Sequence, residues 1–147
     1  MSDISQLLDN ARAFLGLTRE EARRALGGTV HTVEDDEYGQ MSNLTTLEAP
    51  SGFPGTLYVK DEVVELIRIG HDHLATTPPA TLEASLPGPG VRLASRAGKT
   101  AHLAVYAEQG IAYSYHGDRI HFLEIFRPCS QRAYQARIYH RPPDFIR

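Results

Sequence analysis

The sequence contains a single cysteine, Cys129, among its 147 residues. One cysteine excludes an intrachain disulfide and a zinc site built from several thiolates, and it favours a reducing compartment. No apolar run approaches the roughly 18 residues of a membrane-spanning helix. The first residues lack the basic start and small-residue cleavage site of a secretory signal. We therefore expect a cytoplasmic protein with no membrane partner.

A strong charge of either sign is also missing, because the formal net charge is only -3. A dedicated nucleic-acid binder normally carries a large positive excess that neutralises phosphates, so the composition argues against nucleic acid as a partner. With 41% hydrophobic residues, the chain can form one ordinary core or two small modules packed together.

Two short helices are expected at the start of the chain. Residues 3 to 15 place apolar side chains at spacings of three and four. Thr18 and Glu21 then have the spacing of a capping box, and Gly27 can end the second helix. From residue 29, runs rich in Val, Thr, Ile and Leu predict a meander of antiparallel strands, in which 56–60 pairs with 63–69.

The second half of the chain repeats this plan less clearly. A proline-rich connector follows Gly70 and contains a weak helical pattern at residues 81 to 86. Further strands are then expected, with turns near Gly98, Gly110 and Gly117. A last helix is predicted to begin after Ser130, which can act as its cap.

Two stretches of the chain are similar to each other: GTLYVKDEVVELIRIG at residues 55 to 70 and IAYSYHGDRIHFLEIF at residues 111 to 126. An offset of 56 aligns the following pairs: Leu57 with Tyr113, Val59 with Tyr115, Val64 with Ile120, Leu66 with Phe122, Ile67 with Leu123, Arg68 with Glu124, and Ile69 with Ile125. This organisation indicates a tandem duplication, although chance similarity between two hairpins is the alternative. A single module is too small to bury its sheet face, so two would pack side by side.

The predicted fold class is therefore α+β, with two tandem helix-plus-antiparallel-sheet modules packed as one globular unit. The first module spans residues 1–72, and the second, degenerate module spans residues 73–147 with a helical tail.

The run LGLTREEARRALGG, followed by GTLYVKDEVVELIRI, resembles the module of the small SmpA/OmlA-type lipoproteins of the outer-membrane assembly machine. In its tandem form, the pattern is similar to the β-lactamase inhibitor protein family, whose two halves form a concave sheet that grips a partner enzyme. The resemblance implies the fold and a sheet face that binds protein. The export signal, the lipidated cysteine and the disulfides of those proteins have no counterpart here, so the location and the partner do not carry over.

Seven histidines are present, and four of them suggest a metal site as the alternative function. His71 and His73 lie two apart in an extended segment and can reach one side of it. With His116 and His121 they would form the histidine cluster of a metal-dependent hydrolase. No HExxH motif supports this hypothesis, and solvated linker histidines with two ordinary hairpin histidines explain the same positions. We therefore expect no metal and no cofactor.

Tyrosines offer a better candidate for binding. Tyr106, Tyr113 and Tyr115 lie on adjacent predicted strands, and Tyr58 lies in the earlier copy. Strand alternation places Tyr113 and Tyr115 on one face. Exposed tyrosines commonly anchor protein interfaces. Alternatively, these rings pack beneath the helices.

The tail is locally basic and includes Arg132 and Arg137. Its arginines could guide an acidic or phosphate-bearing partner, and a role in nucleic-acid binding would make affinity strongly dependent on salt. They could also neutralise the acidic segment at residues 34–37, within the chain or across a homodimer.

We predict a non-catalytic, intracellular protein-binding module, such as an inhibitor, immunity protein or adaptor. Tyr58, Tyr106, Tyr113 and Tyr115 would anchor the partner, and Arg132 and Arg137 would steer it. The one set suited to nucleophilic catalysis, Cys129 with His140 and Asp144, lacks the sequence context that normally presents a nucleophile.

Overall fold

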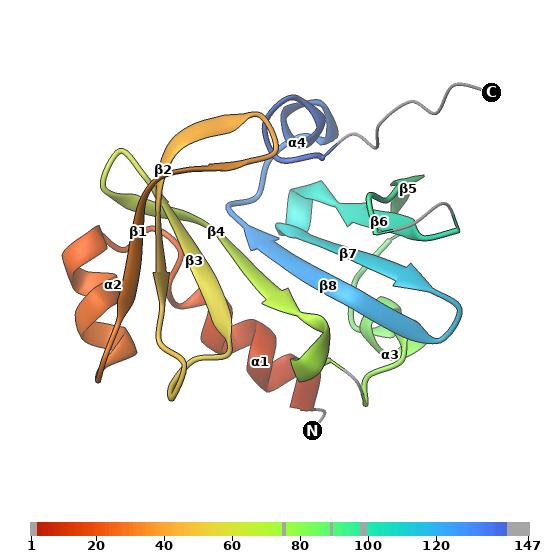
Figure 1. Cartoon of the computed structure of the whole chain (residues 1–147). Helices are drawn as coiled ribbons and strands as arrows, with labels where there is room; N and C mark the ends of the chain where they lie inside the picture. Colours follow the sequence, from red (N-terminus) through yellow and green to blue (C-terminus); the bar gives the residue numbers. More distant parts are fainter. Residues whose placement is uncertain (1–2, 75, 89, 98–99, 141–147) are drawn as a thin grey trace.

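The computed structural model describes residues 3–74, 76–88, 90–97 and 100–140. These residues form one sheet of eight antiparallel strands together with four α-helices, which confirms the predicted α+β class (Figure 1). The strands are β1 (His31–Tyr38), β2 (Met41–Glu48), β3 (Gly55–Lys60), β4 (Val63–Gly70), β5 (Val91–Ala94), β6 (His102–Tyr106), β7 (Ile111–His116) and β8 (Arg119–Phe126). The helices are α1 (Asp3–Arg12), α2 (Arg19–Leu26), α3 (Pro79–Ala84) and α4 (Gln131–Arg137), with short 3-10 turns η1 (His71–His73) and η2 (Ala107–Gln109).

The strand order, β1-β2-β3-β4-β8-β7-β6-β5, gives each half of the chain four neighbouring strands (Figure 1). The last strand of each half meets the other at the centre, and there Arg68 lies directly opposite Glu124. These are the two residues that the sequence offset of 56 aligns. The hairpins β3–β4 and β7–β8 also share an irregularity: their registers shift after Tyr58 and after Ser114, which are 56 positions apart.

Several local predictions are confirmed. The capping box of α2 is complete, because the Glu21 N–H donates to Thr18 Oγ1 at 3.1 Å and the Thr18 N–H donates to Glu21 Oε1 at 2.9 Å. The Ser130 hydroxyl accepts from the Ala133 N–H at 3.0 Å and caps α4. The weak helical pattern in the connector is α3, which begins two residues earlier than predicted. The turn predicted near Gly98 falls at residues 98–99, outside the described residues.

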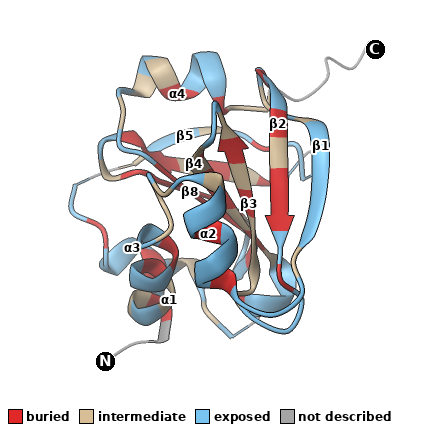
Figure 2. Ribbon diagram, turned by 90° about the vertical axis from the view of Figure 1, so that its left-hand side faces the viewer, coloured by how far each residue is buried: buried red, intermediate tan, exposed pale blue. Residues whose placement is uncertain are grey.

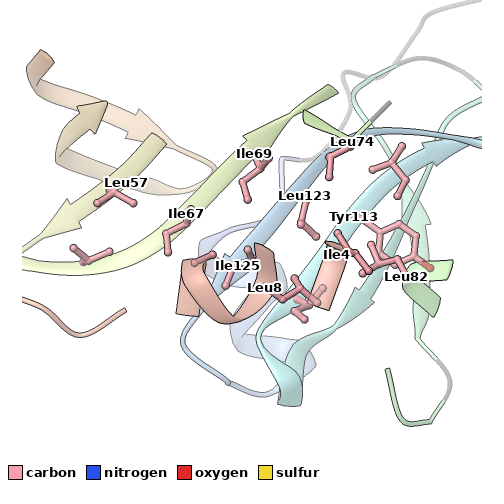
Figure 3. Close-up of a cluster of buried hydrophobic side chains, with 14 of the residues drawn as sticks. Ile4, Leu8, Leu57, Ile67, Ile69, Leu74, Leu82, Tyr113, Leu123 and Ile125 are labelled. Carbon is pink, nitrogen blue, oxygen red and sulfur yellow. The ribbon is translucent and has the colours of Figure 1, made fainter. Parts of the chain in front are cut away.

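Helices α1, α2 and α3 cover one face of the sheet, and the larger apolar cluster fills the space beneath them. Figure 3 shows that Ile4 and Leu8 of α1 point toward Leu123 and Ile125 of β8, which belongs to the other half of the chain. Each fully buried aliphatic side chain contributes about 1.5–3 kcal/mol through removal from water. The first helix therefore ties the two halves together through buried apolar area.

The opposite face of the sheet, here called the open face, carries a smaller apolar cluster. Among the α-helices of the described residues, only α4 packs on it, through Tyr134 and Ile138, and Figure 2 shows that most of the outer surface of α4 is exposed. None of the helices in the described part of the chain is long and apolar enough to cross a membrane.

The tip of the β1–β2 hairpin docks on the end of α4. The Gly39 N–H donates to His140 Nε2 at 3.0 Å, and the Gln40 N–H donates to the Arg137 carbonyl at 2.8 Å. Gly39 has φ +58, and a Cβ added to it would overlap the Ile138 carbonyl. Both the left-handed backbone and the close approach therefore require glycine at this position.

Replacing Gly39 with alanine is expected to destabilise the protein by about 3 kcal/mol, of which about 1 kcal/mol comes from the left-handed backbone and the rest from the clash with α4. Gly117 is a matched control, because it also lies in a hairpin turn, has φ +59, and has no atom within 4 Å of an added Cβ. Gly117→Ala should therefore lose only the roughly 1 kcal/mol of stability that comes from the left-handed backbone. Urea unfolding of both variants measures the difference, and equal losses would contradict the docking of the hairpin on α4.

Candidate functional site

The open face is hollowed by a cavity of about 450 Å³, here called the open-face cavity. Five of the sheet's strands and α4 supply residues to its wall. The lining combines arginines, histidines and aromatic rings with one buried carboxyl group: Glu37, Tyr38, Tyr58, Arg68, Ser95, Arg96, Ala97, Leu103, His121, Phe122, Glu124, Tyr134 and His140. Such a mixture of apolar surface and a few polar groups is typical of binding sites.

Glu124 is the most unusual residue of this cavity, because its side chain is only 1% exposed. The Tyr134 hydroxyl donates to Glu124 Oε1 at 2.5 Å, and the Tyr38 hydroxyl donates to Glu124 Oε2. Burial raises the pKa of Glu124 from an ordinary value of 4.5 to about 7, although the two tyrosine hydrogen bonds and Arg68 oppose that rise. Near neutral pH, the carboxyl group is thus divided between its protonated and charged forms.

The two tyrosines bring distant parts of the chain to Glu124. Tyr38 lies at the end of β1, and Tyr134 lies in α4, so one carboxyl group joins the outer hairpin, the last helix and the central strand. Burial first, and then the charge of Glu124, raise the pKa of both phenols. Both carboxyl oxygens are occupied and shielded from solvent. This arrangement indicates a structural anchor rather than an acid or base that meets a substrate.

Arg68 faces the same cavity from β4. Opposite residues of an antiparallel pair point to the same face, yet the Arg68 guanidinium does not bond Glu124. Its Cζ lies 4.7 Å from the centre of the Phe122 ring, in a cation–π contact. Within the described residues, Arg68 has no carboxylate within ion-pair distance.

Arg96 follows β5 at the exposed rim of the cavity, and it also lacks an ion pair among the described residues. His140 lies nearby with its ring 4.4 Å from that of Tyr38. Burial, followed by the positive charges of Arg96 and Arg68, lowers the pKa of His140. The charges of both arginines therefore reach His140.

The four histidines of the alternative metal site do not come together. His71 Nδ1 lies 3.1 Å from the Ile120 carbonyl oxygen, and His116 Nδ1 lies 3.2 Å from that of Thr100. His73 lines a second cavity with His71, whereas His121 lines the open-face cavity. Within residues 3–74, 76–88, 90–97 and 100–140, no three His, Cys, Asp or Glu side chains form a group that could hold a metal ion.

The four candidate tyrosines divide between the two faces. Tyr106 and Tyr113 are 6% and 2% exposed, and they stack under the helices with ring centres 6.3 Å apart. Tyr113 lies beside Ile4 and Leu82 in Figure 3. Tyr115 shares that face, as expected from strand alternation, and its half-buried ring contacts Tyr113. Tyr106 and Tyr113 thus offer almost no exposed surface to a partner, because they pack under the helix layer.

Tyr58 is the one candidate tyrosine that lines the open-face cavity. It is half-buried, and its ring centre lies 4.8 Å from that of Tyr38. It keeps the position expected of an anchor on an open sheet face.

Of the two arginines predicted to steer a partner, Arg137 forms an ion pair and Arg132 is exposed. Arg137 Nη2 lies 3.6 Å from Glu65 Oε1, and Arg127 binds the same carboxylate at 2.9 Å. Arg132 is exposed on α4. Of the acidic segment, Glu34 pairs with Arg19 at 2.6 Å and not with the tail. Neutralisation of Arg137 thus occurs within the chain, but through Glu65.

Cys129 is half-buried, and burial raises the pKa of its thiol, which disfavours the reactive thiolate. Asp144, the third member of that hypothetical set, lies outside the described residues.

No family model, curated protein or solved structure matches the chain. Sequence reasoning missed Glu124, Arg68, Tyr38 and Tyr134 as site residues. A signal for two of them was present, because the offset of 56 aligns Arg68 with Glu124 inside strands that are mostly apolar. Charged residues at equivalent core positions usually mark a paired or functional site.

Replacing Glu124 with glutamine should remove a specific dependence of stability on pH. Because the pKa of Glu124 is higher in the folded state than in the unfolded state, this residue stabilises the fold fully below pH 4.5. That stabilisation is lost as the pH rises through about 7. Relative to Glu124→Gln, the wild type should therefore lose roughly 3 kcal/mol of unfolding free energy between pH 4.5 and pH 8. Urea unfolding across this range measures the loss, and parallel stability curves for the two proteins would contradict the raised pKa.

Proposed function

We propose that this protein is a non-catalytic protein-binding module, acting as an inhibitor, immunity protein or adaptor, that receives its partner on the open face of the sheet. The observation that carries the proposal is the open-face cavity: α1, α2 and α3 cover the other face, whereas this face leaves Tyr58, Phe122 and Arg68 beside an accessible hollow. Aromatic and arginine side chains are the residues most enriched where interfaces gain their binding energy.

A tandem origin of the two halves supports the same proposal. The symmetric strand order, the pairing of Arg68 with its aligned residue Glu124, and the register shifts 56 positions apart favour duplication over chance similarity. In the inhibitor-like proteins that the tandem pattern resembles, two such modules form a concave sheet that grips a partner enzyme. We therefore assign residues 1–72 and 73–147 to the two modules. The prediction of a cytoplasmic location rests on the sequence, chiefly on its single cysteine.

The anchor set changes from the initial prediction. Tyr58 remains, and Phe122, Arg68 and Arg96 join it because they line the same cavity. Arg132 lies on the exposed side of the neighbouring helix, where it could steer an approaching partner.

The hydrolase alternative requires at least three converging histidines, and the described residues contain no such group. No specific observation therefore favours it over protein binding.

A steric block at the rim tests the proposal without altering any charge. Ala97 is exposed at the mouth of the open-face cavity, so Ala97→Trp should fill the entrance. Ala25→Trp on exposed α2 is the matched control, because it adds the same ring to the opposite layer. A partner captured from the native host should be retained by wild type and by Ala25→Trp, and Ala97→Trp should bind it at least about tenfold more weakly.

The chain has no natural tryptophan, so the introduced indole also reports binding by fluorescence. Equal retention of the captured protein by all three forms would contradict docking on the open face.

A further inference from the structure

Among the described residues, two guanidinium groups line the open-face cavity, but only one accessible carboxylate does. Arg68 and Arg96 both line it, and neither has an ion pair within the described residues. Its acidic lining consists of Glu37, on exposed β1, and Glu124, which is buried and already bonded by two tyrosines. The accessible charge of the cavity is therefore positive.

Arg68 is well placed to meet a ligand. Its guanidinium is held over Phe122, which limits its freedom and lowers the entropy lost on binding. It also lines a second cavity of about 440 Å³, beside Thr56 and Gly70, so its side chain is reachable from two sides. Glu48 and Asp72 also line that second cavity, but neither forms an ion pair with Arg68.

We propose that Arg68 and Arg96 form a carboxylate-binding subsite on the open face, which receives a glutamate or aspartate side chain of the protein partner. This proposal rests on the proposed function and specifies which side chain of the partner the open face would recognise. Guanidinium groups bind carboxylates through short, charge-assisted hydrogen bonds. Because both guanidinium groups line the same cavity, a carboxylate that enters it meets two cationic partners. The Phe122 and Tyr58 rings offer apolar contact for the methylene groups of the same side chain.

The probe is a short glycine–serine peptide carrying two adjacent glutamates, compared with the same peptide carrying glutamines. Its binding to the full chain is followed by NMR on the Nε–Hε signals of the arginine side chains. The glutamate peptide should shift the Arg68 and Arg96 signals, whereas the glutamine peptide should shift them at least about tenfold less at equal concentration. Added salt should weaken the effect, because the rim of the cavity is exposed.

Two variants locate the effect. Arg68→Gln and Arg96→Gln should each weaken peptide binding about tenfold. Arg24→Gln is the matched control, because Arg24 is exposed on α2 and lies far from the cavity in sequence and layer. Arg96 is an exposed rim residue, so its variant keeps the test informative even if Arg68→Gln disturbs the packing on Phe122.

Several outcomes would overturn the subsite. Equal binding of the two peptides, or binding unaffected by both cavity variants, would show that these arginines do not select a carboxylate. Tighter binding of inorganic phosphate at the same residues would assign the site to phosphate. A dimer in sedimentation that Arg68→Gln abolishes would assign the face to a second copy of the chain. If the peptide test fails while Ala97→Trp still loses its partner, the proposed function stands without the subsite.

Discussion

The pairing of β4 with β8 is the interaction on which the rest of the structure depends. Five residue pairs join these strands, and they convert two four-stranded meanders into one continuous sheet. Each meander alone would leave an unpaired central edge and an uncovered apolar face. α1 then crosses from the first half onto β8 and buries the seam from the helix side.

The residues at the centre of the β4–β8 pairing also determine the polar groups of the open-face cavity. Arg68 and Glu124 are neighbours across the strands, but each turns to different partners: the arginine lies over Phe122, and the carboxyl group takes both tyrosine hydroxyls. A buried carboxylate is costly unless hydrogen bonds satisfy it. Tyr38 and Tyr134 meet that need, and in doing so they fix the hairpin tip and α4 at the walls of the cavity. The guanidinium remains available because Glu124 is otherwise engaged.

Much of the fold follows from local signals in the sequence. The capping box at Thr18, the cap at Ser130 and the turn at Gly117 act over a few residues, so they can be recognised without knowing the tertiary contacts. The antiparallel pairing within each meander follows from alternation and short turns for the same reason.

The site was harder to predict because it depends on distant contacts. Strand alternation places Tyr113 and Tyr115 on one face of the sheet, but it does not show which face the helices cover. In the structure, the helices cover the face that carries these two tyrosines. The sequence offset aligns Glu124 with Arg68, but nothing local shows that this carboxyl group is buried, and only the docking of β1 and α4 surrounds it with phenols. Glu65 likewise becomes the partner of Arg137 only when α4 folds back onto the sheet.

The symmetric seam has a consequence for the order in which the chain folds. The hairpins β3–β4 and β7–β8 close over turns of a few residues, so they form quickly and independently. The contact of Gly70 with Phe122 must instead close the whole connector and half of the second meander, which carries a larger entropy cost. The closure of this long loop is therefore the slow step of folding, and we expect it to follow the formation of the two hairpins.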